Sequence, residues 1–233
     1  MSLFPIFLKL EDRPCLVVGA GEIAESKIQS LLAAGARVTV VAPKAKPQLI
    51  AQARKGDFTW HEREFVPRDL DGAFLVVAAT NVPEVNGAVY REAQRRNVIC
   101  NAVDDPPNCD FYFPAIVRRD NLQIAISTAG ESPALAQQLR KEIDAQLPED
   151  LGSWLESLGG LRREVLAAMP AGDARKALLH DLAQRPVCDL ETCPSRRLAR
   201  RVAASEARSL DSVLNGSALP IVEQAVHEHS KHN

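Results

Sequence analysis

The stretch VVGAGEIAESK, residues 17–27, decides the fold of this protein. An apolar run ends in Gly19 and Gly21, and apolar residues then recur at the spacing of a helix. The six residues from Gly19 have the form G-x-G-x-x-A. In this form the first glycine permits a tight turn, the second lets the backbone approach a pyrophosphate, and the small third residue lets helix and strand pack closely. The spacing alone is weak evidence, but its place between a strand and a helix predicts a nucleotide-binding turn.

After this turn, short apolar runs alternate with helical patterns. Predicted strands lie at residues 15–19, 36–43, 58–64, 71–80 and 97–105. Predicted helices lie at residues 24–35, 46–56 and 82–97. Strands that are mostly apolar throughout indicate a parallel sheet covered on both faces. The predicted fold class is therefore α/β, a Rossmann-like doubly wound parallel sheet.

The pattern changes after residue 110. Residues 111–120 and 122–128 read as two strands joined by a polar turn, and a helix follows with Ser132 as N-cap and Pro133 in its first turn. Beyond Pro148 only helical patterns appear. We predict a nucleotide-binding domain at residues 1–110, a small α/β connector at 111–146, and a helical C-terminal domain with a flexible tail at 147–233.

The composition excludes several classes of partner. The 233 residues carry a formal net charge of −2, which gives no reason to expect nucleic acid or an anionic membrane as a partner. No apolar run reaches membrane-spanning length and no signal peptide is apparent, so a cytoplasmic location is expected. Five scattered cysteines favour reduced thiols. The close pair Cys188 and Cys193 is weak evidence for a metal site or a disulfide.

The ends of the predicted strands supply the candidate cofactor site. The second strand is followed by Pro43 and Lys44, where an NAD site usually has a carboxylate for the ribose hydroxyls. Lys44 is compatible with the 2′-phosphate of NADP, whereas backbone amides holding the ribose are the alternative, so the choice between NAD and NADP stays open. The predicted cofactor-binding residues lie at the glycine turn and at the ends of the second and fourth strands: Gly19, Gly21, Glu22, Ile23, Pro43, Lys44, Thr80 and Asn81.

Three stretches resemble the precorrin-2 dehydrogenase family, which comprises the dehydrogenase and ferrochelatase part of siroheme synthase and its stand-alone relatives. They are LFPIFLKLEDRPCLVVGAGEIAESK, AATNVPEVNGAVYREA and NVICNAVDDPPNCDFYFPAIVRRDNLQIAISTAGESPALAQQLRKEI. The resemblance covers residues 3 to about 150 continuously and in order. Ala20 replaces the middle glycine of the family turn, and Ser26 stands where Arg is common before Lys27.

The resemblance implies NAD-dependent oxidation of precorrin-2 to sirohydrochlorin. In several members the same protein then inserts Fe²⁺ to give siroheme, and a dehydrogenase without chelatase activity is the alternative. The resemblance also implies a homodimer formed through the connector and helices, and a chain without the methyltransferase half of fused siroheme synthases. A Rossmann module that only senses a dinucleotide is a further alternative, in which the end of the fifth strand would have no assigned role.

The resemblance assigns roles to residues beyond the cofactor turn. Asp104, after the fifth strand, matches the family's catalytic aspartate, a general base that also assists metal insertion. A turn-forming role is the alternative for Asp104, and Asp105 is the neighbouring candidate. Asn101, Ser127 and Thr128 are predicted to contact substrate. Bonding of Asn101 to the backbone, and loop or helix-cap roles for the two hydroxyls, are the alternatives.

Precorrin-2 is rich in carboxylates, so some basic residues are expected to face it, although a solvated helix face is more typical of each basic run. The candidate runs are Arg118–Arg119, Arg140–Lys141, Arg196–Arg197 and Arg200–Arg201. The tail holds His227, His229 and His232 close together, but no rigid element orients them. We predict no fixed metal site, and iron enters only as a substrate of the implied chelatase.

Overall fold

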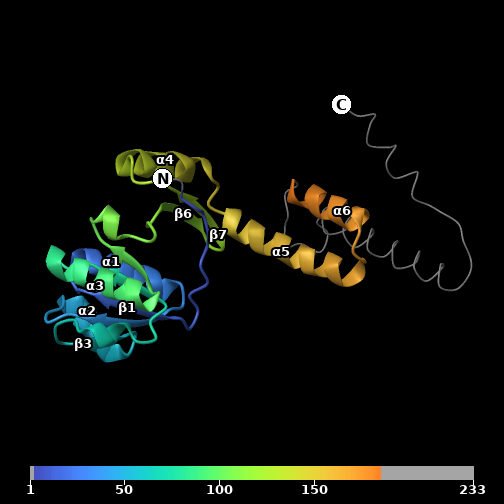
Figure 1. Cartoon of the computed structure of the whole chain (residues 1–233). Coiled ribbons are helices and arrows are strands. Elements are labelled where there is room, and N and C mark those ends of the chain that lie inside the picture. The colour runs from blue at the N-terminus through green and yellow to red at the C-terminus, as the bar shows by residue number, and fades with distance from the viewer. Residues whose placement is uncertain (1–2, 185–233) are drawn as a thin grey trace, which may run out of the picture. The chain divides into compact units, whose positions relative to one another are not determined.

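The computed structural model describes residues 3–184, and its first part is a doubly wound α/β unit (Figure 1). All strand pairs in the five-stranded sheet are parallel, and the order is β3-β2-β1-β4-β5. The strands are β1 (Pro14–Val18), β2 (Arg37–Val41), β3 (Thr59–His61), β4 (Leu75–Ala78) and β5 (Ile99–Ala102). The predicted Rossmann-like fold class is confirmed.

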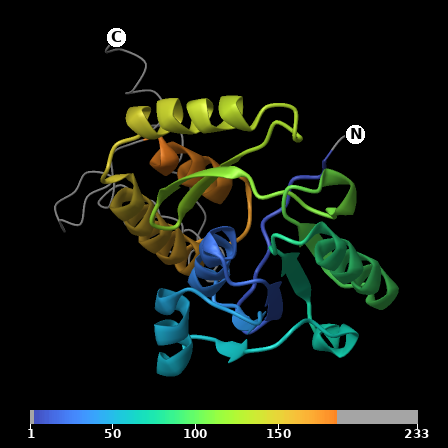
Figure 2. The same cartoon turned by 90° about the vertical axis from the view of Figure 1, so that its left-hand side faces the viewer.

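Helices cover both faces of the sheet. They are α1 (Glu22–Ala33), α2 (Pro47–Lys55) and α3 (Pro83–Arg96). Figure 2 shows α1 and α2 on one side of the sheet and α3 on the other. Alternate strand residues point to opposite faces, so Val17 packs in one core with Ile28 of α1, and Leu16 packs in the other with Val89 of α3. Burial on both faces explains the continuously apolar strands.

The helix ends follow the local chemistry of the sequence. Both α2 and α3 begin with proline, which needs no hydrogen bond for its nitrogen in the first turn. Gly56 ends α2 with a φ of 88°, and Asn97 ends α3 with a φ of 56°. Glycine and asparagine are the residues that most readily adopt this left-handed conformation.

The chain after the Rossmann sheet forms a two-stranded sheet and three helices. They are β6 (Ala115–Arg119), β7 (Leu122–Ile126), α4 (Pro133–Gln146), α5 (Leu151–Ala168) and α6 (Asp173–Ala183). Contacts divide the described residues into two compact units: 3–115 with Ser127–Ala136, and Ile116–Ile126 with 137–184. In the second unit, α5 and α6 bury a small core that includes Leu161, Val165 and Leu182.

Several boundaries differ from the predicted ones. The strand expected from residue 111 begins only at Ala115, because Phe111 and Phe113 pack against the Rossmann core instead. The third strand keeps only three residues. Two short 3₁₀ helices, η1 (Pro67–Leu70) and η2 (Pro106–Asn108), were not predicted. None of the helices among residues 3–184 is long and apolar enough to cross a membrane.

Candidate dinucleotide site and catalytic crevice

The candidate site lies where the sheet changes winding direction. The chain leaves β1 into α1 on one face and leaves the neighbouring β4 into α3 on the opposite face. Ligands of doubly wound sheets bind at such a point, outside the carboxyl ends of the strands. The residues that directly follow β1, β4 and β5 here include Gly19, Thr80 and Asp104.

Gly19 is required by the closeness of the two strand ends. Its φ is +112°, and a Cβ atom at this position would overlap the carbonyl oxygen of Ala79 after β4. Its N–H donates to the carbonyl of Val41 at 2.9 Å, which fixes the turn against β2. Glycine is therefore needed here for the fold itself.

Gly21 differs, because open space surrounds it. A Cβ atom built on Gly21 has no heavy atom within 4 Å, and Gly21 is the N-cap of α1 without a side-chain cap. The first amides of α1 thus lack side-chain partners at the positive end of the helix dipole. This bare helix N-terminus beside open space fits the pyrophosphate of a dinucleotide. The two residues that follow, Glu22 and Ile23, are both exposed.

The end of β2 presents cations rather than a carboxylate. Pro43 and Lys44 are exposed, and Lys44 forms no ion pair within the described chain. Lys46 instead lies 2.5 Å from the Glu25 carboxylate of α1, and its backbone N–H donates to the carbonyl of Ala20. The hydrogen bond that Lys46 donates to Glu25, together with the negative charges of Glu25 and Glu22, raises the pKa of Lys46. This pair joins α2 to the glycine turn.

Thr80 is held at the end of β4 by a side chain of α3. The buried Asn86 accepts hydrogen bonds through Oδ1 from the Thr80 N–H at 3.1 Å and the Thr80 hydroxyl at 2.7 Å. Its Nδ2 donates to the Thr80 carbonyl at 3.0 Å. The turn at Thr80 and the exposed Asn81 is therefore rigid on its β4 side.

Asp104 projects from a left-handed backbone position just beyond β5. Its φ is 60°, which aspartate tolerates better than most side chains, and it is exposed. Its carboxylate makes no hydrogen bond to any residue in 3–184. The neighbouring Asp105 accepts a 2.6 Å hydrogen bond from Asn108 and lies at the start of η2. Of these two neighbours, Asp104 is thus the carboxylate without a hydrogen bond within residues 3–184.

Lys27 of α1 lies within electrostatic reach of Asp104. Its Nζ is 3.8 Å from the centroid of the Phe113 ring. Burial lowers the pKa of Lys27, and the negative charge of Asp104 opposes this shift. A carboxylate and a partly desolvated ammonium therefore lie within electrostatic reach of each other beyond the strand ends.

Asn101 has much of its donor capacity committed within the fold. It is buried in β5, and its Nδ2 donates to the carbonyl of Phe111 at 2.7 Å and contacts the sulfur of Cys109. These bonds match the backbone-bonding alternative for Asn101 and hold the segment after η2 against β5.

Ser127 and Thr128 lie in the same compact unit as the Rossmann sheet. The Ser127 hydroxyl accepts from the Ala129 N–H at 3.1 Å, and the Thr128 hydroxyl accepts from the Ser132 N–H at 3.2 Å. Ser132 in turn accepts from the Leu135 N–H, as expected of an N-cap. Both predicted substrate hydroxyls thus shape the loop, and each keeps its own proton to donate.

The predicted basic runs have different surroundings. Arg119 binds the Asp144 carboxylate at 2.6 Å and also donates to the Asp144 carbonyl, so it joins β6 to the end of α4. Arg140 lies 3.7 Å from the same carboxylate. Arg118 and Lys141 are exposed. The two runs at 196–201 lie outside the described residues.

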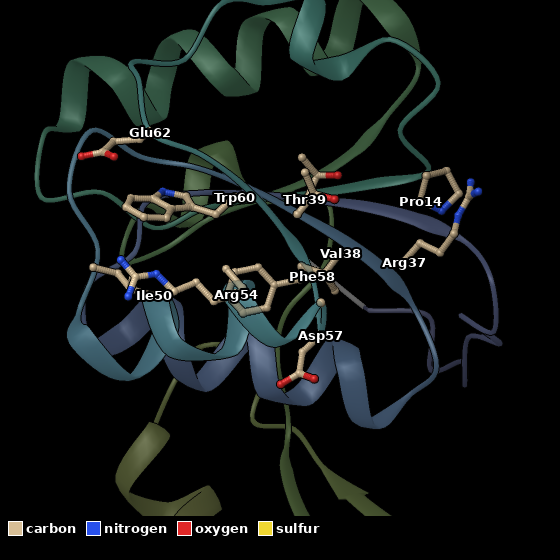
Figure 3. A pocket seen from close by; sticks show the side chains of 13 residues that line it. Pro14, Arg37, Val38, Thr39, Ile50, Arg54, Asp57, Phe58, Trp60 and Glu62 are labelled. Carbon is tan, nitrogen blue, oxygen red and sulfur yellow. The ribbon is translucent and has the colours of Figure 1, made fainter.

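A separate hollow lies away from the crevice. It has a volume of about 920 Å³ and is bounded by α2, β3 and the first residues of β1 and β2. Trp60, Arg54 and Glu62 line it, as Figure 3 shows. Every predicted site residue lies outside its lining. The strand order and the glycine turn therefore locate the candidate site better than the size of this hollow does.

No cluster of three potential metal ligands exists within residues 3–184. Cys15, Cys100 and Cys109 are free thiols. The pair Cys188 and Cys193 and the histidines of the tail lie outside the described residues.

Two residues that matter to this geometry received no role from the sequence. Asn86 interrupts the apolar side of its helix three residues before the buried Val89. A polar residue at such a position indicates a buried side chain that needs hydrogen-bond partners. Lys27 gives no comparable signal, because its ring and carboxylate neighbours come from distant parts of the chain.

The sheet order and the glycine turn define a Rossmann-type protein. Residues 6–115 match the family described as putative NAD(P)-binding, and residues 119–146 match the central domain of sirohaem biosynthesis proteins. The chain belongs to the precorrin-2 dehydrogenase and siroheme synthase family.

Similar proteins come from several bacteria. Siroheme synthase 1 of Aeromonas hydrophila is 47% identical over 176 residues, which are 76% of this chain and 38% of that protein. Siroheme synthase of Methylobacillus flagellatus is 44% identical over 184 residues, 79% of this chain and 39% of that protein. The chain thus spans about two fifths of these relatives. Among solved structures, SirC, a precorrin-2 dehydrogenase, matches 87% of this chain and all of its own, with a TM-score of 0.71 and 25% identity.

Proposed function

We propose that this protein oxidises precorrin-2 to sirohydrochlorin in the cytoplasm, with NAD as the hydride acceptor. The likeness to SirC supports this substrate, since that protein is a precorrin-2 dehydrogenase and its whole length aligns with this chain. The observation that carries the proposal is the free carboxylate of Asp104 beside the dinucleotide crevice.

Some of these residues bind the cofactor, and Asp104 acts on the substrate. The amides at the start of α1 bind the pyrophosphate, Gly21 leaves room for it, and Thr80 with Asn81 borders the crevice from β4. Bound NAD supplies a hydride acceptor. Asp104 accepts the proton that the substrate loses, so that each turnover removes one hydride and one proton from precorrin-2.

We assign NAD rather than NADP as the cofactor. The ammonium of Lys46 is paired with Glu25, and among the lysines that directly follow β2 in the described part of the chain, the exposed Lys44 is left to meet a 2′-phosphate. A single exposed lysine contributes little to the binding of a 2′-phosphate, so NADP gains little over NAD, and turnover with NADP is expected to be measurable.

Turnover of precorrin-2 tests the proposal directly. Purified full-length protein is mixed with NAD and enzymatically made precorrin-2, and the spectra of sirohydrochlorin and NADH are followed. Both products are expected in equal amounts. Binding of NAD without turnover would reject the dehydrogenase and leave the dinucleotide-sensing alternative.

The siroheme synthases among the relatives favour a second activity, insertion of Fe²⁺ into sirohydrochlorin. In this step the two macrocyclic N–H protons leave as the metal enters, and Asp104 accepts one of them. Iron is a substrate in this step, because it is incorporated into the product. Anaerobic addition of Fe²⁺ or Co²⁺ to sirohydrochlorin tests this step. A rate no higher than the spontaneous one would leave a dehydrogenase alone.

A further inference from the structure

Lys27 is a half-buried cation without an anionic partner at bonding distance. None of the ion pairs within residues 3–184 includes it, and the group directly beneath its ammonium is the Phe113 ring, 3.8 Å from Nζ. A cation over an aromatic face is attracted to it, but this contact replaces only part of the lost hydration. Within residues 3–184 the fold therefore partly desolvates the Lys27 ammonium without placing a carboxylate at ion-pair distance from it.

The position of Lys27 on α1 separates it from the pyrophosphate site. The first amides of α1 follow Gly21, whereas Lys27 is the sixth residue of the helix, more than one turn later. Its ammonium lies over Phe113, which follows β5 and η2, and within electrostatic reach of Asp104. Lys27 is therefore grouped with Phe113 and Asp104 rather than with the amides at the start of α1.

The groups that surround the ammonium are themselves anchored in the fold. Phe113 packs edge-on against Phe111 at a centroid distance of 5.4 Å, and Phe111 is held by the Asn101 side chain. Ala24 and Ile28, which flank Lys27 on α1, are fully buried. Both the helix and the ring that position the cation are thus anchored in the core.

We propose that Lys27 binds a peripheral carboxylate of the tetrapyrrole substrate and so orients the macrocycle toward Asp104. This assignment rests on the proposed function, which names a carboxylate-rich substrate. A charge-assisted contact to a carboxylate is stronger than one between neutral groups, particularly where the cation is partly desolvated. Lys27 is then a substrate-binding residue, and Phe113 positions it.

Three variants of the full chain test the assignment. Lys27→Met keeps the apolar stem over Phe113 and removes the charge, Lys27→Arg keeps the charge, and Lys55→Met removes an exposed lysine at the end of α2 as a matched control. Steady-state kinetics with precorrin-2, NAD titration and sirohydrochlorin titration are measured for each, with thermal unfolding as the check of folding.

For Lys27→Met we expect the KM for precorrin-2 and the Kd for sirohydrochlorin to rise about tenfold or more, since a hydrogen bond to a charged group is lost. The kcat and the Kd for NAD should change less than about threefold, because the proposed contact is made to the tetrapyrrole and not to NAD. Lys27→Arg should restore most of the substrate affinity, and Lys55→Met should behave as the unmodified protein. Phe113→Leu, which removes the ring but not the charge, should raise KM to a smaller extent.

Each other result overturns the assignment. Unchanged substrate affinity in Lys27→Met would show that Lys27 does not contact the substrate. A selective loss of NAD affinity would show that Lys27 binds the cofactor. A fall in kcat at constant KM would show that Lys27 acts through Asp104. If the unmodified protein fails to turn over precorrin-2, the proposed function itself fails. Sirohydrochlorin binding with and without Lys27 then still reports on the carboxylate contact.

Discussion

Gly19 and Gly21 serve different purposes although one motif contains both. Gly19 has a positive φ and faces the carbonyl of Ala79, whereas Gly21 has extended backbone and faces open space. The first glycine is required for the close approach of β1 and β4, and the second is required only if a ligand enters that space.

Substituting each glycine by alanine should separate stability from binding. Gly19→Ala should lower the free energy of unfolding by about 3 kcal/mol, from backbone strain and overlap with Ala79. Gly21→Ala should lower it by less than about 1 kcal/mol, because alanine is only a poorer N-cap. Gly21→Ala should nevertheless weaken NAD binding at least about tenfold, since its methyl group occupies the space left for the pyrophosphate. Urea unfolding and NAD titration measure both effects, and equal NAD affinity in Gly21→Ala would contradict the site.

Asp104 and Asp105 form a second matched pair. Asp104→Asn keeps a side chain that tolerates the left-handed backbone and removes the proton acceptor. It should reduce kcat for precorrin-2 oxidation at least about a hundredfold, the usual scale for a general base. Thermal unfolding should not change. Asp105→Asn, which alters the cap of η2, should keep most of the activity, and the reverse pattern would transfer the role to Asp105.

At the scale of elements, the turn from β4 into α3 depends on one buried amide. The three hydrogen bonds between Asn86 and Thr80 tie the first turns of α3 to the end of β4. Buried polar groups are costly when their partners are removed, so this contact contributes to both stability and site geometry.

Asn86→Ala should therefore lower the free energy of unfolding by about 2 kcal/mol, because the Thr80 groups lose their partner. It should also weaken NAD binding, since the turn at Thr80 loosens. Gln48→Ala, at an exposed amide of α2, is the control and should leave both quantities unchanged. Urea unfolding and NAD titration distinguish the outcomes. An Asn86→Ala protein as stable as the control would show that the contact contributes nothing.

The central strands also carry thiols that resist ionisation. Burial raises the pKa of Cys15 in β1 from 9.0 to about 11. Burial, with the nearby charges of Asp110 and Cys109, raises the pKa of Cys100 in β5 from 9.0 to about 12. The folded state thus keeps protons that the unfolded state releases above pH 9.

Stability should consequently fall as the pH rises from about 9 toward 11 to 12. In this window the unfolded state binds fewer protons than the folded state, so the free energy of unfolding decreases with pH, while below pH 9 these thiols contribute no pH dependence. At 1.36 kcal/mol per pKa unit, the loss is about 3 kcal/mol for Cys15 and about 4 kcal/mol for Cys100. Urea unfolding of a Cys15→Ala, Cys100→Ala variant should show a shallower decline over this range, and parallel curves would contradict the assignment.

At the scale of the whole molecule, the two-stranded sheet of β6 and β7 is small for an independent element. Isolated hairpins are marginally stable, and β6 exposes Ile116. We propose that a second copy of the chain pairs with this region to form a homodimer, as the resemblance implies.

Light scattering should therefore give a mass of about twice 25.4 kDa. Ile116→Glu should shift the protein toward the monomer, because it places a charge on the apolar surface that association buries. Gln123→Glu, an exposed polar position on β7, should remain dimeric. A monomeric unmodified protein, or a dimer unaffected by Ile116→Glu, would reject this interface.

The sequence by itself determined the Rossmann class, the order of helices and strands, and the glycine turn. These follow from local properties: hydrophobic periods of helix and strand, proline and asparagine at helix ends, and glycine where φ is positive. Only the tertiary structure decided which polar groups meet. The contact of Lys27 with Phe113 and the bonding of Asn86 to Thr80 depend on how parallel strands align their carboxyl ends and which helix packs beside them. No local pattern encodes such distances, because they arise from the packing of segments far apart in the chain.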